Sequence, residues 1–204
     1  HYIINGEKLW CTNGTKADII VVMAVTPPKI VHGKERKKIT AFLVEMNTPG
    51  VEVLHRCRFM GLKALYNGVI RFTDVKIPKE NMILGEGDGL RLALKTLNTG
   101  RLSIPAGVTG NSKWCMQVNR KWSNERVQWG HPIGEHETIA GKQAKIASDT
   151  FAMDAVWKLA SSMADDKHFD IRLEAAVAKL FNTEAHYAIL QQTLQIRGGR
   201  GFET

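Results

Sequence analysis

The sequence predicts an α+β protein in which a β-barrel-like or sandwich domain is followed by an up-and-down helical bundle. Two observations support this fold class. Up to about residue 78 the apolar residues come in short β-rich runs bounded by turn formers, and after Gly85 they recur at helical spacing. We therefore expect a β domain over residues 1–84 and a helical domain over residues 85–204, the segregated order typical of an α+β protein.

Five segments of the β domain are predicted to be strands. The first, residues 2–10, has the pattern of the start of a hairpin, and the others are the apolar runs 19–25, 39–44, 51–54 and 69–72. Turn formers separate them, namely Asn13-Gly14, Pro27-Pro28, Thr48-Pro49-Gly50 and Asn67-Gly68. The first part of the chain is therefore expected to be a domain of short strands.

Three long helices are expected to follow. The first has Leu90, Leu94, Leu97 and Leu102 on one side and continues towards Trp122. It contains Pro105, which removes a backbone donor and clashes with the preceding turn, so we expect a kink or a break there. The second helix is expected over about residues 137–163. The third is expected over about 170–196, with Gly198-Gly199 as a glycine stop.

Both ends of the chain look incomplete. Residues 2–10 begin as a strand with nothing before them to pair, and the chain stops directly after a glycine-rich turn. We therefore expect these residues to be a fragment of a longer protein.

Composition narrows the class of protein. A hydrophobic fraction of 44% in 204 residues is enough for a packed core. Cys11, Cys57 and Cys115 share no metal-ligand spacing and leave an odd count, so neither a metal site nor a disulfide framework is expected, and a reducing compartment fits best. No apolar run approaches the roughly 20 residues that span a bilayer, so no membrane span is expected.

The formal net charge of +8 suits an anionic partner, such as a nucleic acid, an acidic lipid surface or a phosphate-bearing cofactor. Charge alone does not choose among these. The one dense basic run is Lys34, Arg36, Lys37 and Lys38. Because it follows Gly33 and precedes an apolar stretch, a solvated loop is favoured over a nucleic-acid patch.

Three local features could bind a large, anionic, aromatic cofactor. In residues 10–13 the Trp10 indole could stack on a planar ring beside the Thr12 hydroxyl, although a core tryptophan next to a turn is the alternative. In residues 125–132 Arg126 could clamp a diphosphate, although a surface arginine is the commoner case in such a loop. In residues 195–202 the glycines could bring backbone N–H groups close to phosphate, or could simply end a helix.

The order and spacing of these features resemble the acyl-CoA dehydrogenase family over nearly the whole chain. The matching segments are residues 2–13, Asn47-Thr48-Pro49-Gly50-Val51, Phe59-Met60-Gly61, residues 69–78, Asn98-Thr99-Gly100-Arg101, Arg126-Val127-Gln128-Trp129-Gly130 and residues 195–202. Each segment is weakly specific alone, and together they are specific. The resemblance implies a middle β domain that lacks its first strand and loop, and a C-terminal helical domain that lacks its last helices.

The resemblance also implies which residues hold the cofactor. In that family FAD is bound by the middle and C-terminal domains, and a homo-oligomer, a dimer or tetramer, completes each flavin site. By position, Trp10, Cys11 and Thr12 would lie beside the flavin ring, and Asn98 and Arg101 would meet the acyl-CoA. The diphosphate and adenosine of a neighbour's FAD would be held by Arg126, Val127, Gln128, His136, Glu137, Gln195, Gly198 and Gly199. The chain departs from the family pattern at Cys11, Leu65, Trp129 and Glu137, and Glu137 would put a negative charge near phosphate.

The family reaction is the FAD-dependent α,β-dehydrogenation of an acyl-CoA to a trans-2-enoyl-CoA, with electrons passed to an electron-transferring flavoprotein. It needs a carboxylate base. In most members this glutamate lies beyond the glycine-rich turn, which here means beyond Thr204, and in some branches it lies where this chain has Gly100. The fragment alone is therefore expected to be inactive and to bind FAD weakly. The compartment implied is the cytoplasm of a bacterium or the mitochondrial matrix of a eukaryote.

Alternative functions remain open at this stage. They are an acyl-CoA oxidase and a relative without a base that only binds acyl-CoA or protein; a nucleic-acid binder is disfavoured because no motif for it is found. The large apolar residues of the helical part are expected in core or subunit contacts, namely Leu90, Leu94, Phe151, Trp157, Leu180 and Phe181. His168 and His186 are expected to be surface or core histidines and not ligands.

Overall fold

The structure, a computed structural model, describes residues 1–166 and 168–203, apart from the side chain of Val31. It contains two compact units, His1–Leu94 and Lys95–Thr204. The first turns of the first long helix belong to the first unit. The boundary between the units therefore lies ten residues after the boundary that the sequence suggested, at residue 84. Each unit is described by itself.

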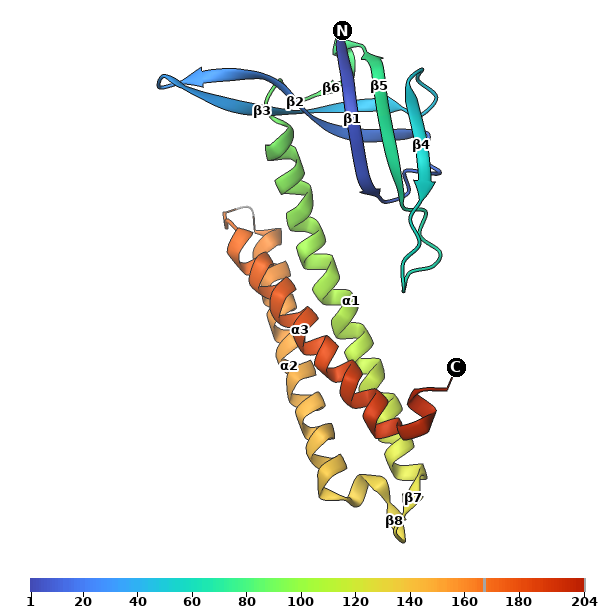
Figure 1. Cartoon of the computed structure of the whole chain (residues 1–204). Coiled ribbons are helices and arrows are strands. Elements are labelled where there is room, and N and C mark those ends of the chain that lie inside the picture. Colours follow the sequence, from blue (N-terminus) through green and yellow to red (C-terminus); the bar gives the residue numbers. More distant parts are fainter. Residues whose placement is uncertain (167, 204) are drawn as a thin grey trace. The chain divides into compact units, whose positions relative to one another are not determined.

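The first unit consists of two three-stranded antiparallel sheets (Figure 1). One has the order β1 (Tyr2–Cys11), β5 (Gly68–Ile77), β4 (Val51–Arg56), and the other has the order β2 (Ile19–Val31), β3 (Lys34–Glu45), β6 (Met82–Ile83). A single buried cluster is formed by the inward residues of both sheets, namely Ile4, Val22, Phe42, Val44, Ile70, Phe72, Val75 and Ile77. The predicted sandwich is confirmed, because alternate side chains of each strand point to the shared core.

The hairpin of β2 and β3 differs from the sequence prediction. Pro27 and Pro28 do not turn the chain. They lie at a bulge between Thr26 and Lys29, beyond which β2 continues to Val31. The turn is instead at His32 and Gly33, whose φ values of 52° and 72° suit a two-residue hairpin turn. The prediction of a loop for the basic run was therefore wrong: this run is part of β3. The prolines are tolerated because β2 is an edge strand and a bulge needs no ladder donor from them.

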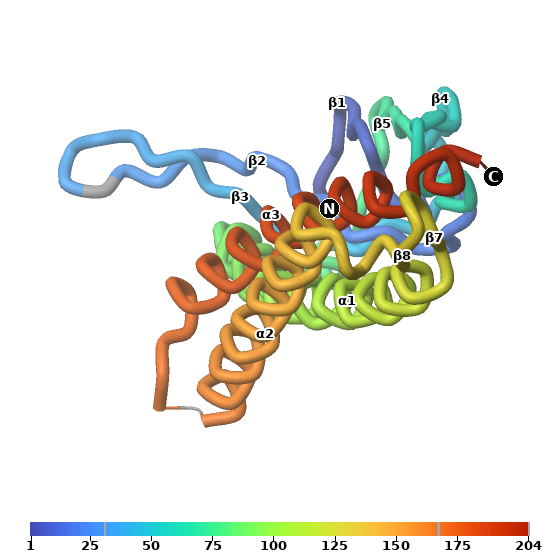
Figure 2. Tube along the Cα trace, turned by 90° about the horizontal axis from the view of Figure 1, so that it is seen from below, coloured from blue at the N-terminus to red at the C-terminus, as the bar shows by residue number. Residues whose placement is uncertain are grey.

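The second unit holds most of α1 (Gly89–Glu125) and all of α2 (Glu137–Asp165) and α3 (Arg172–Arg197), which lie side by side (Figures 1 and 2). Between α1 and α2 are a small hairpin, β7 (Val127–Gln128) and β8 (His131–Pro132), and a short 3-10 turn, Ile133–Glu135. Helices α2 and α3 begin and end within two residues of their predicted limits, and α3 ends at Gly198 as predicted. The predicted helical bundle is confirmed.

Of the kink or break predicted at Pro105, the break does not occur, because α1 is continuous through this residue. Proline deprives the helix of one backbone hydrogen bond. Pro105 is buried, and its carbonyl accepts a bond from the hydroxyl of buried Thr109 at 2.7 Å. The helix therefore tolerates the lost donor within a packed turn.

Helices α1 and α3 are joined by buried polar contacts within the second unit. The Asn182 amide donates to the Thr109 hydroxyl at 3.0 Å, and the Asn119 amide donates to the Thr193 hydroxyl at 3.0 Å. Around them lies the apolar cluster Cys115, Ile133, Ile146, Met153, Ile189 and Ile196. Buried polar groups that pair in only one register specify how the helices align.

Several of the large apolar residues expected in core or subunit contacts are exposed in this chain. Their exposed fractions are 51% for Leu90, 47% for Leu94, 77% for Phe151, 61% for Leu180 and 38% for Phe181, so for these five the expectation that remains is a subunit contact. A helix carries a broad apolar surface, and a neighbour on one side covers only part of it. Trp157 is half-buried, and its indole donates to Asp154 at 3.3 Å.

The two unassigned histidines are both on the helical side. His186 is half-buried, its Nδ1 lies 2.8 Å from the Ser112 hydroxyl, and burial lowers its pKa. His168 is exposed, and its backbone N–H donates to Asp166 at 3.0 Å. Within the described part of the chain no helix is both long and apolar enough to cross a membrane.

Candidate cofactor site

The end of strand β1 presents Trp10 to the surface. In the ladder with β5, Lys8 pairs with Ile70 and Cys11 with Gly68, so β1 has one extra residue there. Trp10 lies in this bulge with φ 56°. This is a left-handed backbone conformation, which is strained for a residue with so large a side chain. Its side chain is 66% exposed. The alternative of a core tryptophan is therefore wrong.

Asn67 holds this strained segment in place. It is 5% exposed, and its amide donates both to the Trp10 carbonyl at 3.2 Å and to the Thr12 hydroxyl oxygen at 3.0 Å. Because that oxygen accepts a bond from Asn67, the hydroxyl hydrogen of exposed Thr12 can be donated outward. The sequence indicates only a turn at Asn67, since nothing local shows that this residue meets a segment 55 residues away.

The remaining residues of this turn are also tightly fitted. Asn13 has φ 61°, and the Gly14 N–H donates to the Cys11 carbonyl at 3.1 Å. A Cβ on Gly68 would lie 2.4 Å from a methyl of Thr15, so that position needs glycine. Burial raises the pKa of the Cys11 thiol, and Lys8 opposes this rise.

A second predicted segment forms the β7–β8 hairpin. Trp129 and Gly130, with φ 52° and 86°, make its two-residue turn, and Trp129 is 87% exposed. His136 contacts this hairpin twice: its Nε2 lies 3.1 Å from the Gln128 carbonyl oxygen, and its ring meets that of Trp129 edge-on at 5.6 Å. The Arg126 carbonyl accepts from Ile133 at 2.8 Å, which fixes the backbone beside the Arg126 guanidinium.

The third predicted segment is the glycine turn after α3. Gly198 has φ 57° and ψ −135°, a conformation essentially restricted to glycine. A Cβ on Gly201 would lie 2.5 Å from the Leu194 carbonyl, so this turn packs directly against the end of α3. The N–H groups of Phe202 and Glu203 both donate to the Gly199 carbonyl at 3.1 Å.

The second and third segments line one groove of about 600 Å³ in the second unit. It is bounded by Trp122, Arg126, Gln128, Trp129, Ile133, Gln195, Ile196, Arg197, Gly198, Gly199, Arg200 and Glu203. The Trp122 indole donates to the Ile196 carbonyl at 3.1 Å, which joins the two walls. The groove therefore brings residues 126–129 and 195–200, which are distant in the sequence, to one place.

The groove has the electrostatics of an anion site. Of its three arginines, Arg200 pairs with Glu203 at 3.0 Å and Arg197 lies 5.3 Å from the centre of the Trp122 ring. Within the described residues Arg126 has no carboxylate partner. A free guanidinium fork, the Gln128 amide and a glycine backbone are donors that suit a diphosphate.

Other predicted site residues lie outside this groove. Val127 is 51% exposed and pairs with Pro132, and Glu137 is in the first turn of α2, where a carboxylate suits the helix dipole. On α1 the Arg101 guanidinium donates to Asn98 at 3.1 Å, and a side chain at Gly100 would meet open space. None of these four predicted site residues is among those that line the groove.

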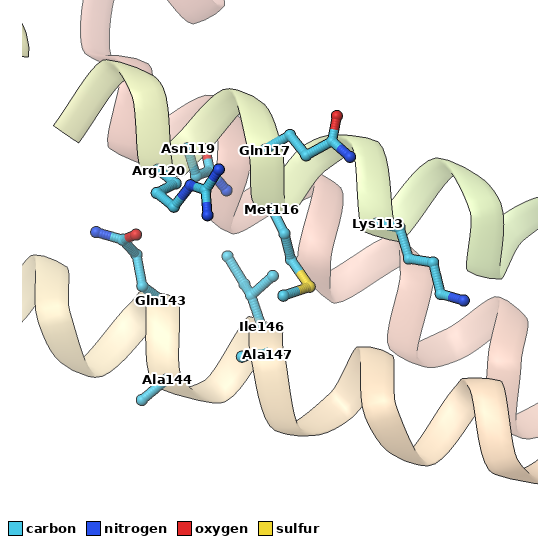
Figure 3. Close-up of a pocket in the computed structure, with 9 residues that line it drawn as sticks. All are labelled: Lys113, Met116, Gln117, Asn119, Arg120, Gln143, Ala144, Ile146 and Ala147. Atoms are coloured by element: carbon cyan, nitrogen blue, oxygen red, sulfur yellow. The ribbon is translucent and has the colours of Figure 1, made fainter. Parts of the chain in front are cut away.

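A further hollow of about 570 Å³ lies between α1 and α2 (Figure 3). None of the residues that line it was predicted from the sequence to bind cofactor or substrate. Met116 and Ile146 point toward one another across it, with Lys113 at its rim. Lys113 bonds Asp154 at 2.6 Å, and Lys158 bonds the same carboxylate at 2.7 Å, which lowers the pKa of Asp154 to about 2. Among the residues described here, no group of three His, Cys, Asp or Glu side chains could hold a metal ion.

Comparison with known protein families gives two matches that together cover most of the chain. Residues 1–75 match the acyl-CoA dehydrogenase middle domain, and residues 87–204 match the acyl-CoA dehydrogenase C-terminal domain. Relatives include the probable acyl-CoA dehydrogenase FadE10 of Mycobacterium tuberculosis, 51% identical over 100% of this chain. The mitochondrial very long-chain specific acyl-CoA dehydrogenase of Rattus norvegicus is 34% identical over 99% of it. The chain spans 31% of the length of each of these curated relatives.

Solved structures share the fold. Butyryl-CoA dehydrogenase from Megasphaera elsdenii superimposes with a TM-score of 0.88 at 31% identity, covering 99% of this chain and 51% of its own. An acyl-CoA dehydrogenase from Bacillus anthracis, solved as a complex with FAD, has a TM-score of 0.86 at 27% identity and covers 100% of this chain and 37% of its own.

Proposed function

Because this chain belongs to the acyl-CoA dehydrogenase family, we propose that the whole protein to which these 204 residues belong is an FAD-dependent acyl-CoA dehydrogenase. It converts an acyl-CoA thioester to the trans-2-enoyl-CoA and passes the electrons to an electron-transferring flavoprotein. The observation that supports this most directly is the groove in which Arg126 and Gln128 face the Gln195–Gly199 backbone.

The donors on the chain fit FAD in their chemistry. A buried dianionic diphosphate needs a guanidinium and backbone N–H groups, which the groove offers. A flavin ring needs an aromatic wall and a hydrogen-bond donor, and exposed Trp10 and Thr12 provide these on the first unit. FAD of the family, when bound, supplies the acceptor for the hydride that leaves C3 of the acyl chain.

The chain's own residues have positioning roles in this proposal. Asn67 keeps Trp10 and Thr12 in the one conformation that presents the indole and the hydroxyl together. Arg126, Gln128 and the glycine turn hold the diphosphate of an FAD whose flavin serves a neighbouring subunit, so the protein acts as a homo-oligomer. Val127, His136 and Glu137 lie near the adenosine, and Asn98 and Arg101 hold the CoA moiety.

The proton on C2 needs a carboxylate base. We propose that this base is a glutamate outside residues 1–204, because the alternative family position is Gly100, which has no side chain. A bacterial protein would work in the cytoplasm and a eukaryotic one in the mitochondrial matrix.

The proposal is tested on the purified whole protein by its visible spectrum before and after anaerobic addition of a fatty acyl-CoA. Bound flavin that bleaches on addition supports a dehydrogenase. A protein that takes up no FAD contradicts the proposal, and flavin that does not bleach with any acyl-CoA indicates a relative without a base. Admission of oxygen then separates the dehydrogenase, which stays reduced, from an acyl-CoA oxidase, which recolours at once.

A further inference from the structure

Arg197 lines the groove, but the proposed function gives it no role. It is in the last turn of α3, where a cation suits the helix dipole whatever else it does. Its side chain also borders a second hollow of about 570 Å³ between α1 and α3, which Trp114, Tyr187 and Leu194 help to line. The contact that holds the guanidinium on one side or the other therefore decides what it can bind.

Trp122 provides that contact on the side of the groove. It lines the groove and not the second hollow, and its ring centre lies 5.3 Å from the guanidinium carbon of Arg197, within the range of a cation–π interaction. A guanidinium group that stacks on a ring keeps the N–H groups along its edge free. Within the described residues those N–H groups of Arg197 have no hydrogen-bond acceptor and no carboxylate partner, so they are available to a ligand.

Trp122 is also bonded to both walls of the groove. Its backbone carbonyl accepts from the Arg126 N–H at 2.9 Å, and its indole donates to the Ile196 carbonyl at 3.1 Å. The Ile196 carbonyl is one of the last four of α3, which have no partner inside the helix. The indole therefore satisfies a group at the start of the glycine turn, and one residue sets the separation between Arg126 and that turn.

The charges in the groove favour a ligand that meets two arginines together. Arg200 is neutralised by Glu203 at 3.0 Å, whereas Arg126 and Arg197 have no carboxylate partner among the described residues. Two unpaired cations that line one groove repel each other, and an anion bound there removes this repulsion. A dianionic diphosphate matches two guanidinium forks in charge and in hydrogen-bond geometry.

We propose that Arg197 is a second guanidinium ligand of the FAD diphosphate, and that Trp122 is the positioning residue that holds both Arg197 and the glycine turn in place. This rests on the proposed function, because it concerns the same groove. It deepens that function by naming two residues on which the affinity of the groove for FAD depends.

The test is a titration of the whole protein, stripped of flavin, with FAD, followed by flavin fluorescence. Arg197→Gln should bind FAD roughly tenfold more weakly, and its binding should depend less on salt, because one ionic contact is lost. Trp122→Phe keeps a ring but loses the indole donor, and should weaken binding roughly threefold. Trp122→Leu loses both, and adding Arg197→Gln to it should weaken binding no further, because the guanidinium is already displaced.

Two controls make matched changes outside the groove. Arg120→Gln removes the same charge from an exposed residue that borders the hollow between α1 and α2 (Figure 3). Trp157→Phe removes an indole donor from another half-buried tryptophan, which is bonded to Asp154 at 3.3 Å. Both controls should bind FAD as the wild type does. The thermal midpoint of each apoprotein separates weaker binding from loss of folding.

Weaker and less salt-dependent binding by Arg197→Gln at a wild-type thermal midpoint supports the proposal, together with no further loss in the Trp122→Leu background. Wild-type affinity of either Arg197→Gln or Trp122→Phe overturns it, and neither variant requires Trp122→Leu to fold. An additive loss in the double variant also overturns it, since Arg197 would then bind without Trp122. Equal losses in the controls do the same, because net charge or general packing would then explain them. All these outcomes leave the proposed function standing, whereas a wild type that takes up no FAD overturns both.

Discussion

Replacement of Asn67 by alanine should loosen the segment that presents Trp10 and Thr12. The amide of Asn67 is the donor in both contacts, at 3.2 Å to the Trp10 carbonyl and 3.0 Å to the Thr12 hydroxyl. Without these contacts, the left-handed backbone of Trp10 at φ 56° loses a restraint that opposes its strain.

The size of the effect follows from those two bonds. A hydrogen bond contributes about 0.5–1.5 kcal/mol to stability, which gives about 1–3 kcal/mol for the pair. The Asn67 Oδ1 is buried with no partner among the described residues, which is itself destabilising. Removal of this atom therefore recovers part of the stability lost with the two bonds. We expect a net loss of about 1–2 kcal/mol. If FAD binds only the ordered segment, affinity should fall about 5- to 30-fold.

Asn5→Ala is the matched control. Asn5 also bridges β1 and β5 through two side-chain bonds, from its amide to Asp74 at 3.0 Å and from the Asp74 N–H at 2.8 Å, but it is exposed and has no contact with Trp10. The whole protein, stripped of flavin, is titrated with FAD by fluorescence, and the thermal midpoint of each apoprotein is recorded alongside.

The expected result is a weaker FAD complex for Asn67→Ala and a near wild-type one for Asn5→Ala. A variant that loses thermal stability but binds FAD as tightly as wild type would refute the positioning role and leave Asn67 as a packing residue. Equal losses of FAD affinity in both variants would refute it too, since the effect would then be general to the β1–β5 pair.

Three further predictions concern the second unit. Arg126→Lys keeps the charge but loses the planar fork, and should weaken FAD binding about tenfold in the same titration; unchanged affinity would remove Arg126 from the site. Gly198→Ala forces a side chain into φ 57° and should cost about 1–3 kcal/mol in thermal unfolding. Gly199→Ala, where a Cβ meets open space, should cost far less, and equal costs would contradict the strain argument. The bond to Lys113 is the main cause that holds the pKa of Asp154 at about 2, below its ordinary value of 3.8. Its ion pairs should therefore stabilise the fold fully above about pH 3.8 and lose this contribution as the pH falls towards 2. Asp154→Asn should abolish that part of the acid dependence, measured as the unfolding midpoint against pH.

Secondary structure was largely predictable because its signals are local. The helical spacing of apolar residues and the glycine stop at Gly198 placed α2 and α3 within two residues. Local rules failed where tertiary surroundings override them. Pro105 remains inside α1, in a turn that is packed and buried, and Pro27-Pro28 remains inside an edge strand because a bulge needs no donor from it.

The properties of the candidate site likewise fall into those that the sequence determines and those that depend on the tertiary structure. The sequence alone determined the chemistry of the candidates, since Trp10, Arg126 and the glycines carry their aromatic, cationic and conformational properties wherever they lie. Only the tertiary structure decided that residues 126–129 meet residues 195–200 in one groove, that the Trp10 indole faces outward, and that Asn67 holds it there. Those facts depend on contacts between residues about 55 to 75 positions apart. Chain folding sets such contacts, and no local pattern of residues encodes them.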